Sequence, residues 1–255
     1  MTKFVREEYT VDGVKTVLHT AGSGEPVVVF HGAGTVDGFD FAEQWADRFR
    51  VIVPYHPGFG ESSDDPTFTN IHDYVMHYLA LFETLGIDKL RLVGVSLGGW
   101  MAAQFASEHN DRVKKLVLIA PAGMIDPEHP PLDVLATPGE VIVGSLVSNF
   151  EVLKRKLPAN PGIDFIADRY REATTLARLW WEHPFDPKFL RHLKRVKMPT
   201  MILWGDEDKI VPVQQSALWQ KHIPHADVRV IRGAGHILYL DKPEAIETIG
   251  NFLAG

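Results

Sequence analysis

Short runs of hydrophobic residues, many of them β-branched, alternate along the chain with segments of helical spacing. Nearly continuous hydrophobic strands that are separated by helices are typical of a parallel sheet covered on both faces. Ahead of these runs, Tyr9–Val11 and Val14–His19 flank an Asp12-Gly13 turn, which predicts an antiparallel hairpin. The pattern therefore predicts an α/β fold around a mostly parallel sheet. The expected parallel strands are Val27–Phe30, Val51–Val53, Leu90–Val95, Leu116–Ile119, Met201–Trp204 and Val228–Ile231.

One amphipathic helix is predicted together with both of its ends. Asn70 is a good N-terminal cap, and the apolar residues that follow it recur at i, i+3, i+4 and i+7. Gly86 then ends the pattern, as glycine does at many helix C-termini. We expect this helix between the second and third parallel strands. Its apolar stripe consists of Ile71, Tyr74, Val75, Tyr78, Phe82 and Leu85.

The alternation of strands and helices stops between about Gly123 and Val196. Prolines interrupt amphipathic helical stretches there, and no parallel-strand pattern is present. We interpret residues 123–196 as a helical cap that is inserted into a core made of residues 1–122 and 197–255. The aromatic residues of this segment either line an apolar cavity above the carboxyl edge of the sheet or form the insertion's own small core. They are Phe150, Phe165, Trp180, Trp181 and Phe185.

Composition narrows the class of protein. With 255 residues, 45% of them hydrophobic, the chain is long enough to bury one substantial core. It carries 26 basic and 33 acidic side chains, and no run of Lys or Arg is long enough to follow a phosphate backbone. Nucleic acid and anionic membranes are therefore not expected partners. The absence of cysteine excludes disulfides, thiolate metal sites and a cysteine nucleophile. Residues 1–10 are charged and no membrane-length apolar segment occurs, so a cytoplasmic location is expected.

Candidate chemistry starts at Gly94-Val95-Ser96-Leu97-Gly98, which joins a predicted strand to a helix of small residues. A serine on such a turn is held exposed by a strained backbone, as in a nucleophile elbow. Gly94 and Gly98 provide the small neighbours that this geometry requires. The glycines do not follow the G-x-G-x-x-G order of a dinucleotide-binding turn. We therefore predict that Ser96 is a nucleophile.

A serine nucleophile needs a base and a carboxylate that orients the base. His236 follows the last predicted strand through Gly233-Ala234-Gly235, a flexible turn that can place an imidazole over the sheet edge. An unperturbed imidazole titrates at about 6.5, which suits proton transfer near neutrality. We assign the carboxylate to Asp208, which lies where the chain enters its next helix, and Asp206 remains the alternative.

Acyl transfer also requires N–H donors directed at the developing oxyanion. The N–H of Leu97 lies at a helix start, where backbone donors are free. The loop His31-Gly32-Ala33-Gly34 follows a predicted strand and can fold close to the nucleophile, so Ala33 is the second candidate donor. A phosphate-binding loop would need a lysine that this segment lacks. For His31 itself we expect a structural, hydrogen-bonded role.

In chain order these motifs resemble those of the α/β-hydrolase superfamily over essentially the whole sequence. The resemblance is carried by His31-Gly32, Pro57–Ser62, the Ser96 elbow, the Asp208 loop and Gly235-His236. Within the superfamily the chain is similar to capped single-domain esterases and to meta-cleavage-product hydrolases, which split carbon–carbon bonds. The resemblance implies an α/β-hydrolase fold with a mostly parallel sheet of about eight strands, flanking helices and a helical cap.

Three positions set the chain apart from parts of this superfamily. Tyr55-His56-Pro57 occupies the place where many relatives carry an Asp and an Arg before the glycine, and the role of His56 is open. Ile237 follows His236, whereas many carbon–carbon hydrolases carry a tryptophan there. Haloalkane dehalogenases and epoxide hydrolases have an aspartate at the elbow, so Ser96 argues against both activities.

The expected function is hydrolysis of a small carboxylic ester or lactone through an acyl-enzyme, with no metal or organic cofactor. Two alternatives stay open: carbon–carbon hydrolysis of the meta-cleavage type, and a non-catalytic small-molecule receptor on the same fold. The partner is expected to be an apolar or aromatic, ester-like small molecule. Its candidate pocket residues are Trp180, Trp181, Phe150 and Ile237.

Overall fold

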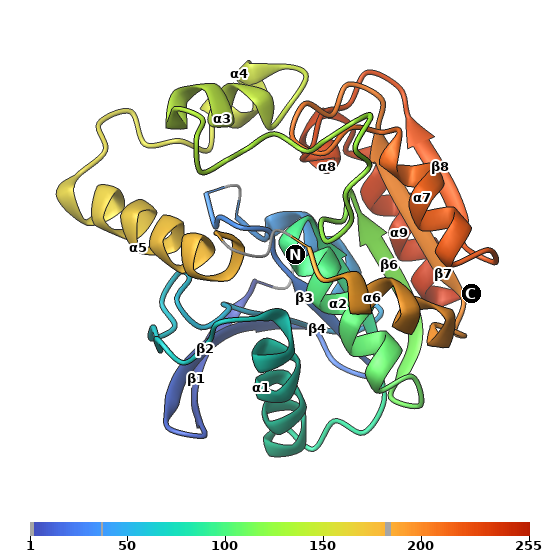
Figure 1. Cartoon of the computed structure of the whole chain (residues 1–255). Helices are drawn as coiled ribbons and strands as arrows, with labels where there is room; N and C mark the ends of the chain where they lie inside the picture. Colours follow the sequence, from blue (N-terminus) through green and yellow to red (C-terminus); the bar gives the residue numbers. More distant parts are fainter. Residues whose placement is uncertain (1–2, 37, 182–184) are drawn as a thin grey trace.

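An eight-stranded sheet with the strand order β1-β2-β4-β3-β5-β6-β7-β8 runs through the molecule (Figure 1). The computed structural model describes residues 3–36, 38–181 and 185–255. β1 pairs antiparallel with β2 and β2 with β4, and all other neighbouring strands are parallel. This confirms the predicted mostly parallel sheet with its opening hairpin. The strands are β1 Val5–Val11, β2 Val14–Ala21, β3 Pro26–Phe30, β4 Arg50–Pro54, β5 Leu90–Val95, β6 Val113–Ile119, β7 Thr200–Gly205 and β8 Asp227–Ile231.

Both faces of the inner part of the sheet are buried. Successive side chains of a strand point to opposite sides, so one inner strand contributes to the hydrophobic cluster on each face. In β5, Leu92 belongs to one hydrophobic cluster and Val93 to the other, and the same alternation separates Leu118 from Ile119 in β6. Helices cover each face. One face packs on α1 Ile71–Thr84, α2 Leu97–Glu108 and α7 Gln215–His222, and the other on η1 Asp40–Trp45, α8 Leu238–Asp241 and α9 Glu244–Ala254.

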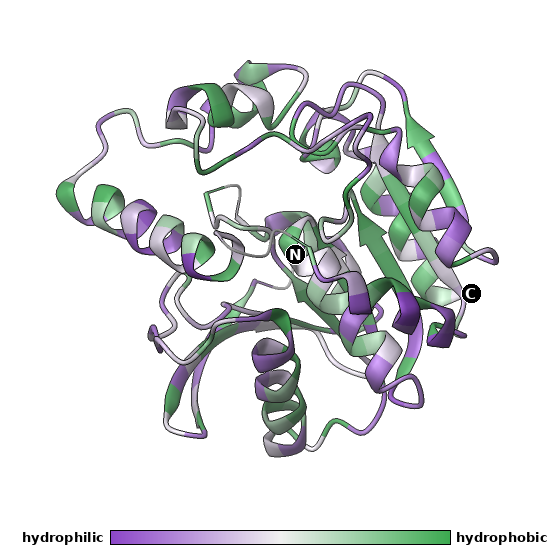
Figure 2. Cartoon of the chain, viewed as in Figure 1, coloured by the Kyte–Doolittle hydropathy of each residue, from purple (hydrophilic) through white to green (hydrophobic). Residues whose placement is uncertain are grey.

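Hydrophobic residues are concentrated in the inner strands, whereas helices mix hydrophobic and hydrophilic positions (Figure 2). The helix α5, which covers Ile163–Trp180, shows this mixture along its whole length. Among the residues that the structure describes, no helix combines the length and hydrophobicity that crossing a membrane would require.

Residues 123–196 contribute helices and no strand of the sheet within their described part. The helices are α3 Gly139–Ser145, α4 Phe150–Lys154, α5, α6 Pro187–His192 and the 3-10 helix η2 Leu193–Arg195. Two of them, α6 and η2, pack against α2 of the core. The other three lie on a different side of the molecule, with α4 next to α8 (Figure 1). The described part of this segment is therefore helical, as expected.

The predicted ends of α1 are confirmed in atomic detail. Asn70 accepts a hydrogen bond from the N–H of Asp73, and the Asp73 carboxylate accepts one from the N–H of Asn70, which together form a capping box. Gly86, two residues beyond the helix, has a φ of +66°, a conformation that favours glycine.

We expect Asn70→Ala to lower the free energy of unfolding by about 1 kcal/mol, because the first turn of α1 loses its side-chain acceptor. Urea-induced unfolding of the wild-type protein and the variant measures the difference. Asn160→Ala, at an exposed position outside any helix, is the matched control and should change stability by less than about 0.5 kcal/mol. Equal destabilisation by both variants would contradict the assigned cap.

Candidate active site

Ser96 occupies a strained turn between β5 and α2. Its φ of 53° and ψ of -116° lie outside the conformations that non-glycine residues usually adopt, at a cost of about 1–3 kcal/mol. The surrounding backbone holds this conformation: the Ser96 N–H donates to the carbonyl of Ile119 at 2.9 Å. The Ser96 carbonyl accepts from the N–H groups of Trp100 and Ala122 at 3.1 and 3.0 Å. The turn therefore has the geometry that the motif predicted for a nucleophile elbow.

Glycines allow the elbow to lie directly against β3. A Cβ atom on Gly98 would come within 2.3 Å of the carbonyl oxygens of both Phe30 and His31, a distance that real atoms do not reach. A Cβ atom on Gly32 would lie only 3.5 Å from Cβ of Ser96. The loop after β3 is thus packed beside the candidate nucleophile, and any larger residue at Gly98 would force the two apart.

Asp208 and His236 form a buried pair at the same edge of the sheet. His236 Nδ1 lies 2.8 Å from Oδ2 of Asp208, and the other carboxylate oxygen accepts the N–H groups of Ile210 and Val211, both at 2.9 Å. Both side chains are almost fully buried. Asp206 instead accepts the N–H of Gly233 at 2.7 Å. Of the two candidate carboxylates, Asp208 is therefore the one hydrogen-bonded to the imidazole.

The loop that carries His236 is supported by residues of the helical segment. The N–H of Ile237 donates to the carbonyl of Leu146 at 2.8 Å, and the hydroxyl of Ser148 donates to the carbonyl of Gly233 at 2.8 Å. A Cβ atom on Gly235 would collide with the backbone of Val147 at 2.7 Å. The segment before α4 therefore packs directly on the turn that positions the imidazole.

The two predicted oxyanion donors are the backbone N–H groups of Ala33 and Leu97. Within the described part of the chain, neither Ala33 nor Leu97 donates its N–H to a backbone carbonyl. Leu97 is the first residue of α2, where the helix itself provides no acceptor. Ala33 follows Gly32, which lies beside Ser96. Both donors are consistent with the role expected from the sequence.

A buried pair of histidines organises the loop that contains Ala33. His31 Nδ1 lies 2.7 Å from the carbonyl of Gly32 and donates to it, while His31 Nε2 accepts the backbone N–H of His56 at 3.1 Å. Burial lowers the pKa of His31 to about 4, so the ring is neutral near pH 7. His31 therefore has the structural role that we expected.

His56 completes this network and thereby acquires a role that the sequence left open. Its Nε2 donates to the carbonyl of His31 at 2.9 Å, and its Nδ1 accepts a hydrogen bond from the hydroxyl of Tyr78 on α1. Burial lowers the pKa of His56 well below its usual value, which keeps this ring neutral as well. The departure from the common Asp and Arg pattern was the sequence signal, but the partner residues were not predictable from it.

Glu172 is a further residue near the site that sequence analysis missed. It lies on α5 and is 3% exposed. Its Oε1 accepts hydrogen bonds from the hydroxyl of Thr35 at 2.7 Å, from the N–H of Gly60 at 3.1 Å and from Arg169 at 3.0 Å. Burial raises the pKa of Glu172, and the neighbouring Arg169 opposes that rise. A lone glutamate in an amphipathic helix gives no sequence signal for such a position.

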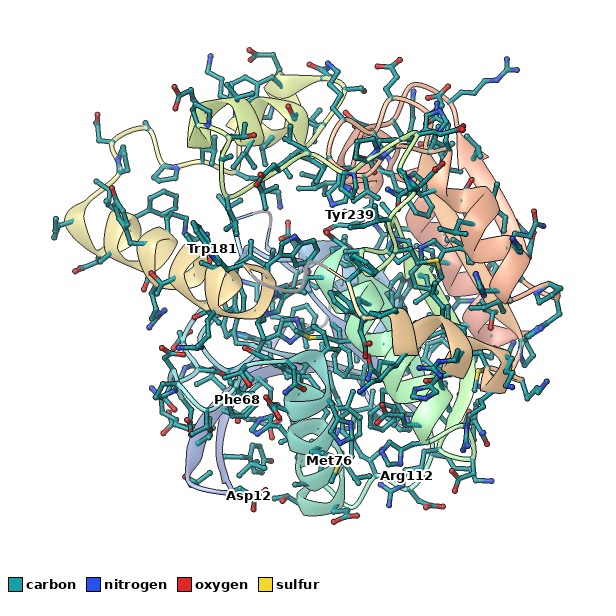
Figure 3. All side chains as sticks on the ribbon, in the orientation of Figure 1. Asp12, Phe68, Met76, Arg112, Trp181 and Tyr239 are labelled. Atoms are coloured by element: carbon teal, nitrogen blue, oxygen red, sulfur yellow. The ribbon has the colours of Figure 1, made fainter. Side chains whose placement is uncertain are left out.

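The four predicted pocket residues are not all in one place. Trp180 and Trp181 line a pocket of about 540 Å³ between the end of α5 and residues 125–136. Trp180 also packs edge-on against Trp100 of α2, with ring centroids 5.8 Å apart, whereas Trp181 is 76% exposed (Figure 3). Phe150 and Ile237 do not line this pocket: Phe150 is partly exposed on α4, and Ile237 is buried in the cluster that contains α9.

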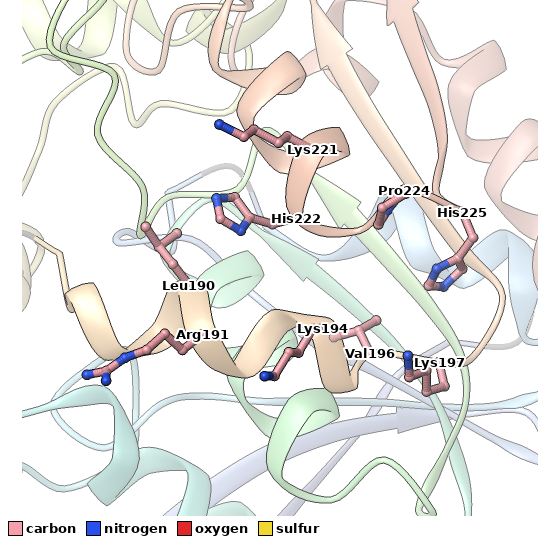
Figure 4. Close-up of a pocket in the computed structure, with 9 residues that line it drawn as sticks. All are labelled: Leu190, Arg191, Lys194, Val196, Lys197, Lys221, His222, Pro224 and His225. Carbon is pink, nitrogen blue, oxygen red and sulfur yellow. The ribbon is translucent and has the colours of Figure 1, made fainter.

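A second pocket, of about 610 Å³, lies between the α6–η2 segment and the end of α7 (Figure 4). Basic side chains dominate its lining, and it contains none of the candidate catalytic residues. Among the residues described, no group of three or more His, Cys, Asp or Glu side chains is arranged to hold a metal ion. The pocket is lined by Leu190, Arg191, Lys194, Val196, Lys197, Lys221, His222, Pro224 and His225.

A strained serine elbow and a buried carboxylate–imidazole pair on a mostly parallel sheet together define an α/β-hydrolase-type enzyme. Residues 27–248 match the model of the alpha/beta hydrolase family, and the chain belongs to that family. The protein is thus a hydrolase of the α/β-hydrolase fold, as the motifs indicated.

Three known proteins illustrate the similarity. The sequence is 27% identical to 2-hydroxymuconate semialdehyde hydrolase of Pseudomonas sp. (strain CF600), covering 98% of this chain and 94% of that protein. The structure superposes on 2-hydroxy-6-oxo-6-phenylhexa-2,4-dienoate hydrolase from Rhodococcus sp. strain RHA1 with a TM-score of 0.82, 22% identity and full coverage of both chains. It also resembles a thermophilic esterase from Thermogutta terrifontis, with a TM-score of 0.76, 25% identity and 98% coverage of each chain.

We expect Asp208→Asn to lower kcat by about 10⁴-fold, because an amide cannot hold His236 in the required tautomer or stabilise its protonated form. Asp206→Asn keeps an oxygen acceptor for Gly233 and should leave kcat within about threefold of the wild-type value. Steady-state kinetics on the substrate that the wild-type enzyme turns over compares the two. A larger loss from Asp206→Asn than from Asp208→Asn would reverse the assignment.

Proposed function

We propose that this protein is a serine hydrolase that cleaves a carbon–carbon bond in a small, conjugated diketone of the meta-cleavage type. The observation that carries the proposal is the similarity over 98% of the chain to a 2-hydroxymuconate semialdehyde hydrolase. The sequence motifs favour ester or lactone hydrolysis, with carbon–carbon hydrolysis of the meta-cleavage type as the alternative. The relatives favour the carbon–carbon hydrolysis.

Each candidate residue has one role in the proposed reaction. Ser96 attacks the substrate carbonyl, and His236 takes the hydroxyl proton while Asp208 holds and stabilises the imidazole. The N–H groups of Ala33 and Leu97 stabilise the resulting oxyanion. The buried Asp208–His236 contact at 2.8 Å and the strained φ of Ser96 support these roles.

The bond changes balance without a redox partner. Addition of the Ser96 oxygen to the ketone gives a tetrahedral oxyanion, whose collapse breaks the adjacent carbon–carbon bond. Conjugation stabilises the departing carbanion, which takes up at carbon the proton that His236 received from Ser96, so the fragment leaves and the imidazole is neutral again. His236 then deprotonates a water molecule that attacks the acyl-enzyme, so a carboxylic acid is released and the Ser96 hydroxyl is restored.

We further propose that residues 123–196 act as a cap over this site. The contacts of Leu146 and Ser148 with the His236 loop and of Glu172 with Thr35 support this role. Such a cap would exclude water during cleavage of the carbon–carbon bond and admit it for hydrolysis of the acyl-enzyme.

Ester hydrolysis is the second candidate, and two observations favour it. One is the similarity to the Thermogutta esterase at 25% identity. The other is Ile237, which stands where many carbon–carbon hydrolases have a tryptophan. The same residues would serve, with an alcohol leaving in place of a carbon fragment.

Ser96 should react with an aryl fluorophosphonate, and peptide mass mapping should locate the label on this residue. Ser96→Ala should remove the labelling and lower turnover by at least about 10³-fold, because it removes the proposed nucleophilic hydroxyl. Labelling elsewhere, or parental turnover by the variant, would refute the nucleophile. A wild-type protein that binds candidate substrates without any labelling or turnover would instead favour the receptor.

A paired substrate panel distinguishes the two hydrolase functions. We expect kcat/KM for 2-hydroxy-6-oxo-6-phenylhexa-2,4-dienoate to exceed that for p-nitrophenyl acetate and p-nitrophenyl benzoate by at least about tenfold, which corresponds to about 1.4 kcal/mol. Loss of the dienoate absorbance and release of nitrophenolate measure the two reactions. The opposite ranking would make ester hydrolysis the function.

A further inference from the structure

The loop that carries Ala33 is held at two points by different parts of the chain. At its base, His31 is hydrogen-bonded to His56, which lies after β4. Two residues beyond Ala33, the Thr35 hydroxyl donates to Glu172 of α5 at 2.7 Å. The base is therefore fixed by the core, whereas the far side depends on a helix of the 123–196 segment.

Glu172 is arranged as the centre of this second attachment. A single carboxylate oxygen accepts from Thr35, from the N–H of Gly60 and from Arg169, and Arg169 also donates to the Thr35 hydroxyl at 3.0 Å. A Cβ atom on Gly34 would lie 3.9 Å from the other oxygen of Glu172, so the carboxylate borders the loop backbone itself. Burial of a carboxylate is costly, and three donors offset that cost only while α5, the loop and Gly60 stay together.

We propose that Glu172 is a positioning residue: it couples the docking of α5 to the placement of the Ala33 N–H beside Ser96. This inference rests on the proposed function, because it assigns the purpose of the coupling to oxyanion stabilisation. When α5 is docked, the carboxylate holds Thr35 and hence the loop, and the donor points at the reacting carbonyl. When α5 moves away, the loop loses its outer attachment and the donor is no longer fixed.

The chain provides a matched control for a role in helix docking alone. Arg178, in the last turn of α5, pairs with Asp64, and that contact does not involve the loop after β3. Glu172→Gln and Asp64→Asn therefore make the same chemical change. Each replaces a carboxylate that pairs with an arginine of α5 by the corresponding uncharged amide. Only the first touches the oxyanion loop.

The test combines kinetics with hydrogen exchange. We expect Glu172→Gln to lower both kcat and the rate at which an aryl fluorophosphonate labels Ser96 by about tenfold. Glu172→Ala should lower both rates about 100-fold. The KM of each variant should stay within threefold of the wild-type value. Thr35→Val, which removes one hydroxyl at constant size, should lower the same rates about fivefold and keeps the test decisive if a Glu172 variant does not fold. Asp64→Asn should leave both rates within twofold. Amide exchange of residues 31–36 should accelerate in the Glu172 and Thr35 variants and not in Asp64→Asn.

The outcomes separate this inference from the proposed function. An active wild-type enzyme whose Glu172 and Thr35 variants keep their kcat, or lose activity only through KM, would overturn the positioning role and leave the nucleophile assignment intact. Unchanged exchange of residues 31–36 in the folded variants would overturn it as well. A wild-type protein that neither reacts with the fluorophosphonate nor turns over any member of the panel would overturn the proposed function, and this inference with it.

Discussion

Close backbone contact between the start of α2 and the end of β3 is the constraint on which the candidate site depends. The carbonyl groups of Phe30 and His31 lie so close to Gly98 that no side chain fits between them. This contact sets the distance between the strained Ser96 turn and the loop that carries Ala33. The proposed nucleophile Ser96 and the proposed oxyanion donor Ala33, more than 60 positions apart in the chain, are thus brought near each other because two backbones touch.

Neutral, buried hydrogen bonds then hold the loop without adding charge to the site. His31 and His56 are both kept uncharged by burial, and each ring nitrogen has a partner. A charged pair at this position would carry a large desolvation cost and would also change the field at the oxyanion. The network therefore orients the loop, while the carboxylate of the candidate site, Asp208, is paired with His236.

The helical segment 123–196 contacts two parts of the candidate site, the turn that carries His236 and the loop that carries Ala33. Residues around Val147 support the turn that carries His236, and Glu172 reaches the loop that carries Ala33. Because the two contacts come from different parts of residues 123–196, displacement of this segment would disturb the proposed base His236 and the proposed oxyanion donor Ala33 together. A substrate that orders the segment would thereby also order the groups that act on it.

Periodicity and short motifs in the sequence determined the strands, the capped helix α1 and the serine elbow, because each depends on neighbours within a few residues. The choice between Asp206 and Asp208 was different. Both follow β7 on the same short loop, and only the folded backbone shows that one carboxylate bonds the imidazole while the other bonds Gly233. The separation of Phe150 and Ile237 from Trp180, the role of His56 and the contacts of Glu172 likewise depend on residues far apart in the chain. Local physics specifies the elements, whereas contacts between distant segments, which leave no periodic pattern, are decided by how the whole chain packs.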